Sequence, residues 1–64
     1  MEIFGQRLKA ARRRKGFTQQ YMADQLQIHR STYTKYETLG VEPSLEAFVQ
    51  IIKILDVDPM ELLE

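Results

Sequence analysis

Cysteine and tryptophan are absent from the 64 residues, and His29 is the single histidine. Without cysteine the chain forms no disulfide, so it is not one of the small secreted domains that depend on such bonds. One histidine and no cysteine cannot supply the ligands of a conventional zinc site. The serine and threonine hydroxyls lack the base and orienting group that a nucleophile needs. We therefore expect no metal, no cofactor and no catalytic residue.

Long apolar runs are also missing, since no more than three apolar residues follow one another. A membrane helix needs about 20 such residues in succession, so none is expected, and no signal-peptide pattern opens the chain. A domain this short buries only about 60% of its unfolded surface and uses its large apolar side chains for the core. Few remain to line a catalytic pocket. We expect one non-enzymatic domain over residues 1–64, located in the cytoplasm.

The net charge is zero, but the charges are distributed unevenly along the chain. Residues 1–40 carry eight Lys and Arg against three Asp and Glu, a balance of +5, and residues 41–64 carry one against six, a balance of −5. This division predicts a basic side that faces phosphates and an acidic side that faces solvent or a partner. A chance division is the alternative interpretation.

Apolar residues at helical spacing predict three short helices in the first forty residues. A first helix over residues 3–15 ends at Gly16, which can adopt the left-handed conformation that follows a helix. Thr18 caps a second helix of about two turns, and His29, a weak cap, precedes a third from residue 30 to about residue 38. The inward residues are expected to be Phe4, Leu8, Ala11, Met22, Ala23, Leu26, Tyr33 and Tyr36.

After a loop over residues 39–43, Ser44 caps a fourth helix, and Asp58 with Pro59 opens a fifth. The fourth helix has two apolar stripes. Its inward stripe is predicted to be Leu45, Phe48, Val49, Ile52 and Leu55, and its second stripe is Ala47, Ile51 and Ile54. Either this helix is buried on most sides, or part of its surface contacts a second copy of the chain. In the latter case the candidate dimer surface is Ile51, Ile54, Met60 and Leu63. The predicted fold class is all-α, a compact five-helix bundle.

Residues 18–37 show the pattern of a helix-turn-helix, two short helices joined by a turn of three or four residues. The side of the third helix opposite its two tyrosines offers cationic donors and hydroxyls but no carboxylate, which suits the edges of DNA bases. An ordinary solvated helix face is the alternative. The residues on this side are Arg30, Ser31, Thr34 and Lys35.

The segments Thr18–Leu26 and Ile28–Glu37 resemble the helix-turn-helix of the phage-repressor (Cro-like, Xre-like) family. Arg7–Phe17, Pro43–Glu46 and Leu55–Leu63 extend the resemblance over nearly the whole chain. It implies a lambda-repressor-like DNA-binding domain with the third helix in the major groove. The family's base-reading positions fall on Arg30, Ser31, Thr34 and Lys35, and its phosphate-side positions on Thr18, Gln19, His29 and Thr38. The Gln19 amide meets a phosphate or braces a reading residue. A structural ion pair of the family falls on Arg12 and Glu37.

The resemblance also implies a function, a transcriptional repressor that binds a palindromic double-stranded DNA operator as a homodimer on the bacterial or phage-type nucleoid. Its half-sites are expected about 34 Å apart. Gln27 and Asp56 stand where the family has glycine, so both are expected in left-handed geometry. Residues 38–42 contain no basic residue. The alternative function is a protein-interaction module, adaptor or antitoxin-like, that uses the acidic carboxyl-terminal half and the second stripe of the fourth helix.

Overall fold

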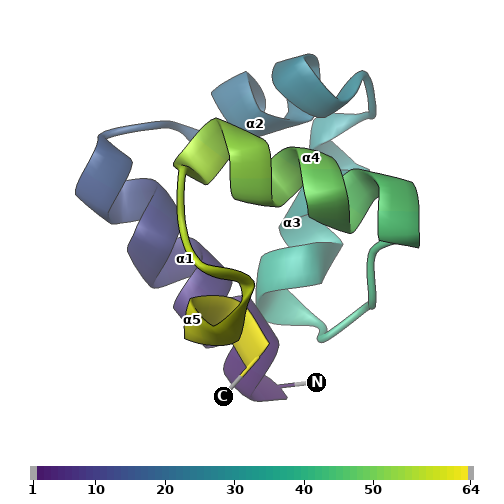
Figure 1. Cartoon of the computed structure of the whole chain (residues 1–64). Helices are drawn as coiled ribbons and strands as arrows, with labels where there is room; N and C mark the ends of the chain where they lie inside the picture. Colours follow the sequence, from purple (N-terminus) through teal and green to yellow (C-terminus); the bar gives the residue numbers. More distant parts are fainter. Residues whose placement is uncertain (1, 64) are drawn as a thin grey trace.

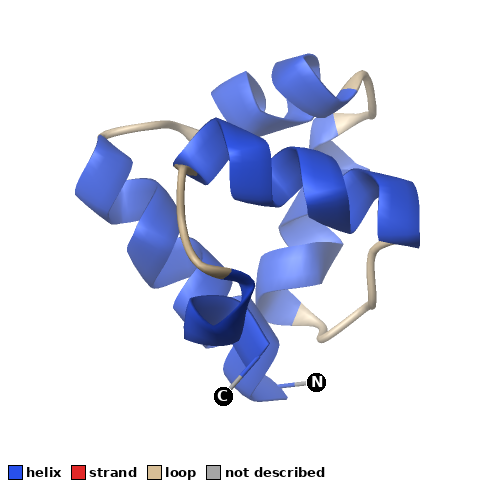
Figure 2. Ribbon diagram, viewed as in Figure 1, coloured by secondary structure: helices blue, strands red, loops and turns tan. Residues whose placement is uncertain are grey.

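The structure is a computed structural model that describes residues 2–63, and within that range it contains five α-helices and no strand (Figures 1 and 2). The helices are α1 (Glu2–Lys15), α2 (Gln19–Leu26), α3 (Arg30–Thr38), α4 (Leu45–Leu55) and α5 (Pro59–Leu63). The expected all-α, five-helix architecture is therefore confirmed.

Helix α1 contacts α3, α4 and α5, while α2 packs against α3 and α4 (Figure 1). Each helix buries one apolar side against the others, because no helix this short is stable without tertiary packing. The expected inward residues of α1, α2 and α3 are all buried. The shared core is Phe4, Leu8, Ala11, Met22, Ala23, Leu26, Tyr33, Tyr36, Ile51, Leu55 and Leu62.

The helix ends follow the capping residues of the sequence. Gly16 takes the left-handed conformation at φ 77°, and the Phe17 N–H reaches back to the Arg12 carbonyl at 3.2 Å. The Thr18 hydroxyl accepts the Tyr21 N–H at 2.9 Å, which begins α2. Ser44 begins α4 and Asp58 begins α5 through the same kind of side-chain bond. These local bonds satisfy amides that the helices themselves leave unpaired.

Two non-glycine residues end helices in the left-handed conformation, as expected. Gln27 follows α2 at φ 58°, and Asp56 follows α4 at φ 53°. The Ile28 N–H closes the first of these turns on the Ala23 carbonyl at 3.0 Å. A residue other than glycine costs about 1 kcal/mol in this geometry. The turn between α2 and α3 is thus kept short at a small cost in stability.

Helix α1 passes the end of α3 at a glycine. Gly5 is buried, and a Cβ placed on it would overlap the backbone carbonyl oxygen of Glu37 and lie 2.9 Å from that of Tyr36. Only a residue without a side chain allows the two backbones to approach so closely. This contact fixes where α3 ends relative to α1.

The predicted inward stripe of α4 is wrong at two of its residues. Leu45 is 78% exposed and Val49 is also exposed, whereas Ile51, assigned to the second stripe, is fully buried. The reason is that α4 packs against α2 and α1 through the side that carries Ile51 and Leu55. Ile51 is therefore not available to a dimer surface, and Ile54, half-buried, packs against the core.

Candidate nucleic-acid interface

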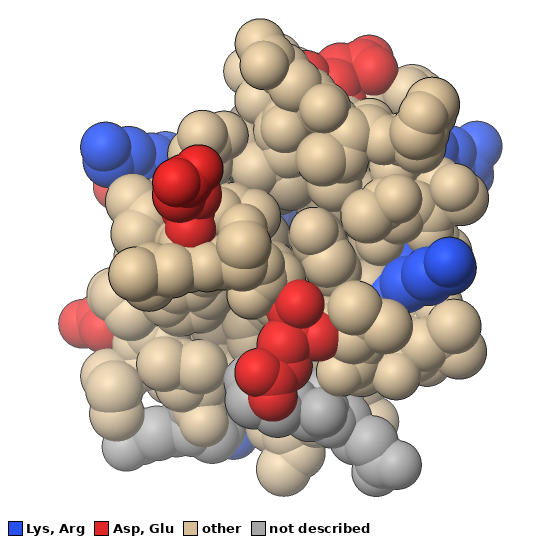
Figure 3. Space-filling model, turned by 90° about the vertical axis from the view of Figure 1, so that its right-hand side faces the viewer, with Lys and Arg blue, Asp and Glu red and all other residues tan. Residues whose placement is uncertain are grey.

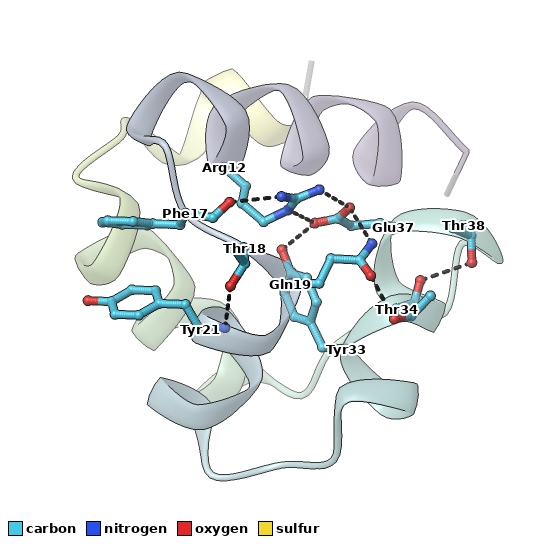
Figure 4. A network of polar contacts seen from close by, with 9 residues as sticks. All are labelled: Arg12, Phe17, Thr18, Gln19, Tyr21, Tyr33, Thr34, Glu37 and Thr38. Carbon is cyan, nitrogen blue, oxygen red and sulfur yellow. Dashed lines mark hydrogen bonds and ion pairs between the residues drawn. The ribbon is translucent and has the colours of Figure 1, made fainter.

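A buried ion pair joins α1 to α3. The Arg12 Nε donates to Glu37 Oε2 at 2.7 Å, and the Arg12 Nη2 donates to Glu37 Oε1 at 3.2 Å (Figure 4). The Glu37 carboxylate is fully buried and the Arg12 side chain is 9% exposed. The Arg12 Nη1 also donates to the Phe17 carbonyl at 2.9 Å. A single guanidinium therefore holds α3, the end of α1 and the turn before α2 together.

Two further donors complete the surroundings of this carboxylate. The Tyr33 hydroxyl donates to Glu37 Oε2 at 2.5 Å, and the Gln19 Nε2 donates to Glu37 Oε1 at 3.1 Å. Burial by itself raises the pKa of Glu37, but the hydrogen bonds from Arg12, Tyr33 and Gln19 outweigh it and hold the pKa below its ordinary value. Burial and the bond to the carboxylate raise the pKa of Tyr33. Glu37 is thus an anion that only accepts.

The Gln19 amide carries this network to the outer side of α3. Its Oε1 accepts the Thr34 hydroxyl at 3.1 Å (Figure 4). Gln19 thus contacts Thr34, one of the positions expected to read bases. The Thr38 hydroxyl donates to the Thr34 carbonyl at 2.9 Å, within α3 itself.

The four expected base-reading positions lie on the side of α3 away from the core. Arg30, Ser31 and Lys35 are exposed, and Thr34 is half-buried. The two tyrosines of α3 are buried with their rings edge to face, 6.0 Å apart, so they belong to the core. The outward side of α3 therefore presents cations and hydroxyls without a carboxylate.

A groove of about 560 Å³ lies beside this surface, where the end of α1 meets the start of α2. Its basic residues come from two helices, with Lys9 and Arg13 exposed one turn apart on α1 and Arg30 on α3. The positive end of α2 adjoins it, and a helix start favours phosphate oxygens. The lining is Lys9, Arg12, Arg13, Phe17, Thr18, Gln19, Gln20 and Arg30.

The sequence indicated that the basic end of the first helix, residues 12–15, lies near phosphate, but it gave Lys9 no role. The spacing of four residues between Lys9 and Arg13, on the side of α1 opposite its apolar stripe, was the available signal. Of the expected phosphate-side residues, Thr18 and Gln19 line the groove, while His29 is exposed at the start of α3. Thr38 lies at the other end of α3, beside a separate hollow.

The loop after α3 and the start of α4 lie on the side of the molecule that faces the viewer in Figure 3. Figure 3 shows mostly uncharged residues there, with isolated acidic and basic side chains. A shallow apolar hollow of about 180 Å³ is lined by Phe4, Glu42, Pro43, Leu45, Phe48 and Leu63. Leu63 was expected on a dimer surface, and Met60, expected there too, is exposed on the same helix.

Two negative observations concern the described part of the chain. No helix within residues 2–63 is long and apolar enough to cross a membrane. The same residues contain no group of three or more His, Asp or Glu side chains placed to hold a metal ion.

Known proteins resemble this chain in sequence and in structure. A family model described as Helix-turn-helix matches residues 8–62. The SPbeta prophage-derived HTH-type transcriptional regulator YonR of Bacillus subtilis (strain 168) is 45% identical over 62 residues, which cover 97% of this chain and 57% of YonR. The HTH-type transcriptional regulator YqaE of the same organism is 46% identical over 55 residues, covering 86% of this chain and 47% of YqaE. The chain thus spans about half the length of these curated relatives.

A solved structure agrees with these sequence matches. The restriction-modification controller protein C.AhdI from Aeromonas hydrophila superposes with a TM-score of 0.83 and 33% sequence identity, over 95% of this chain and 92% of C.AhdI. The family model covers most of the chain, and the five helices with the α2–α3 motif are those that the sequence resemblance implied. The chain belongs to the helix-turn-helix family of phage-repressor (Xre-like) type.

Proposed function

We propose that this domain binds double-stranded DNA in a sequence-specific manner and regulates transcription, as a repressor, with α3 in the major groove. The observation that carries the proposal is the side of α3 that bears Arg30, Ser31 and Lys35, all exposed, and the half-buried Thr34, beside a basic groove. Such a surface combines base-reading donors with phosphate contacts, and both are needed for specific binding. Bound in this way, the protein lies on the nucleoid in the cytoplasm.

The roles divide by position. Arg30 and Lys35 suit the O6 and N7 acceptors of guanine, and Ser31 and Thr34 offer hydroxyls to the neighbouring bases. For the phosphates we retain Thr18, Gln19, His29 and Thr38, and we add Lys9 and Arg13 from the groove. Gln19 can contact a phosphate while it stays bonded to Glu37, because its Nε2 has a second hydrogen besides the one donated to Glu37.

This proposal is tested by selecting binding sequences from random duplex DNA at low salt, with Arg30→Ala run in parallel. We expect an enriched two-fold motif in which Arg30→Ala loses the preference at one base position, at a cost of about 1 to 3 kcal/mol. Arg13→Ala is expected to weaken all sequences evenly and to reduce the salt dependence of binding. Lys53→Ala, on the exposed side of α4, is the matched control and should change neither.

Two outcomes would contradict this assignment. Arg30→Ala could weaken every sequence equally, in which case Arg30 contacts phosphate only. If wild-type protein enriches no motif, the DNA-binding proposal fails.

We further propose that the operator is palindromic and bound by two copies, which meet through the apolar hollow of Leu45, Phe48 and Leu63. An exposed and mostly apolar hollow, with Glu42 in its lining, is suited to a second copy. Leu45→Glu should weaken self-association in sedimentation experiments and abolish the two-fold symmetry of the selected motif. Leu39→Glu is the control, since Leu39 is 69% exposed in the loop and lies outside this hollow.

The same hollow favours a second candidate function, docking of a different protein with DNA binding incidental. Apolar docking changes little with salt, whereas binding through several phosphates falls steeply as salt rises. This candidate would be supported if the chain binds another protein at high salt, and if Leu45→Glu abolishes that binding while Arg30→Ala leaves it unchanged.

A further inference from the structure

We propose that Thr34 reads an exocyclic amino group in the major groove, that of adenine or cytosine, because the network behind Thr34 leaves its hydroxyl oxygen able only to accept. The inference rests on the proposed function, since it concerns how α3 reads a base once it lies in the groove. It follows from the order of donors and acceptors along the chain of hydrogen bonds from Arg12 to Thr34.

The order begins at Glu37. Its buried carboxylate accepts four hydrogen bonds, two from Arg12, one from Tyr33 and one from Gln19. An ionised carboxylate has no hydrogen to donate, so each partner that faces it must donate. The bidentate guanidinium, itself permanently charged, keeps the carboxylate in this state.

Glu37 then determines which way the Gln19 amide points. The opposite orientation would place the amide carbonyl oxygen against the carboxylate, with two acceptors facing each other. The Nε2 therefore faces Glu37 at 3.1 Å and the Oε1 faces Thr34. Because Gln19 is half-buried at the start of α2, the amide has little freedom to leave this arrangement.

The Thr34 hydroxyl is the last member. Its single hydrogen is donated to the Gln19 Oε1 at 3.1 Å, which leaves the hydroxyl only its oxygen lone pairs for a further hydrogen bond. In the major groove the donors of the bases are the N6 amino group of adenine and the N4 amino group of cytosine, while guanine and thymine present acceptors. The exposed hydroxyl of Ser31 can rotate to donate or accept, so it makes no such distinction.

The test is selection from random duplex DNA with four proteins, wild type, Thr34→Val, Thr34→Ser and Gln19→Met. We expect one position of the wild-type motif to require adenine or cytosine. Thr34→Val keeps the size and the methyl group but replaces the hydroxyl by a second methyl, so that the requirement for adenine or cytosine disappears at this position and nowhere else. Thr34→Ser keeps it. Gln19→Met frees the hydroxyl hydrogen, so that thymine and guanine are also accepted at that position.

A base analogue gives a second readout on the selected site. Where the position prefers adenine, replacing it by a purine without the 6-amino group should weaken wild-type binding about 3- to 10-fold and leave Thr34→Val unaffected. Circular dichroism of each variant checks that its total helix content equals that of the wild type before binding is compared.

The result that overturns the inference is distinct from failure of the proposed function. If Arg30→Ala alters one position of a wild-type motif but Thr34→Val selects the wild-type motif, α3 reads DNA and Thr34 does not read an amino group. If Thr34→Ser loses the preference and Thr34→Val keeps it, the threonine methyl makes the contact. If no motif is selected, the proposed function fails and this inference fails with it.

Discussion

Replacement of Arg12 by methionine tests how much the fold depends on the pair between α1 and α3. Methionine has a similar length and fills the same space, but it removes both bonds to Glu37 and the bond to the Phe17 carbonyl. The Glu37 carboxylate stays fully buried, with the Tyr33 hydroxyl and the Gln19 amide as its remaining donors. Arg12→Met therefore leaves a buried charge without its counter-ion.

The expected loss is large compared with the stability of so short a chain. Removing one partner of a buried pair costs about 3 to 5 kcal/mol. At about 0.05 to 0.15 kcal/mol per residue, a domain of this size has a free energy of unfolding of about 3 to 10 kcal/mol. With a denaturant slope of about 1 kcal/mol per molar urea, the urea midpoint should fall by about 3 M or more. Urea unfolding followed by circular dichroism measures this shift.

The pH dependence provides the sharper test. In the wild type the pKa of Glu37 is lowered below its ordinary value of 4.5, so its contribution is present above that pH and is lost as the pH falls through the lowered pKa. In Arg12→Met burial dominates and raises the pKa of Glu37 instead. The difference in stability between the variant and wild type is then large near neutral pH and should shrink as the pH falls toward about 4.

Arg14→Met in the same helix is the control. Arg14 bonds to Glu61 at 3.2 Å, but these side chains are 66% and 49% exposed, so its loss should cost less than about 1 kcal/mol at any pH. If Arg12→Met costs no more stability than Arg14→Met, the buried pair does not stabilise the fold. If the loss of stability in Arg12→Met does not decrease as the pH falls, a buried Glu37 charge is not its cause.

Three further outcomes are expected from unfolding measurements. Gly5→Ala should destabilise the protein by about 1 to 3 kcal/mol, because the new Cβ meets the backbone of α3, and thermal melts should show it. Gln27→Gly should stabilise it by up to about 1 kcal/mol by relieving the left-handed conformation; a loss would contradict this. In wild type, stability should fall below about pH 4.5 through Glu37. It should also fall above about pH 10 as Tyr33, whose pKa is raised by burial, is forced to ionise.

The helix ends could be predicted from sequence because their signals are local. Gly16, Thr18, Ser44 and Asp58 each act on amides or carbonyls within a few residues along the chain. Whether the rest of the chain is folded does not alter which of these residues can cap a helix.

The inward side of α4 could not be predicted in this way. Apolar residues surround most of this helix, so periodicity alone does not separate the side of Leu45 and Val49 from the side of Ile51. Packing against α1 and α2 determines which side of α4 faces the core, because it buries Ile51 and leaves Leu45 78% exposed. A tertiary contact decides it, and no short window of sequence contains that information.

The contacts of the candidate site were only partly predictable from local sequence. The pairing of Arg12 with Glu37, 25 residues apart, came from the family resemblance, because nothing local links them. The bond from Tyr33 to Glu37 had a local signal, since residues four apart share a helix face. The bond from Thr34 to Gln19 had no local signal, because it depends on how α2 and α3 are placed by their packing.

Helix α3 separates its residues into two groups, and this has a consequence for how such domains diverge. Tyr33, Tyr36 and Glu37 hold the helix in place, while Arg30, Ser31 and Lys35 are exposed. Substitutions at exposed positions usually change stability by less than about 0.5 kcal/mol. Under the proposed function, descendants of one ancestor can therefore acquire new operators through these three positions without compensating changes in the core. Thr34 is the exception, because its evolution is tied to Gln19 in another helix.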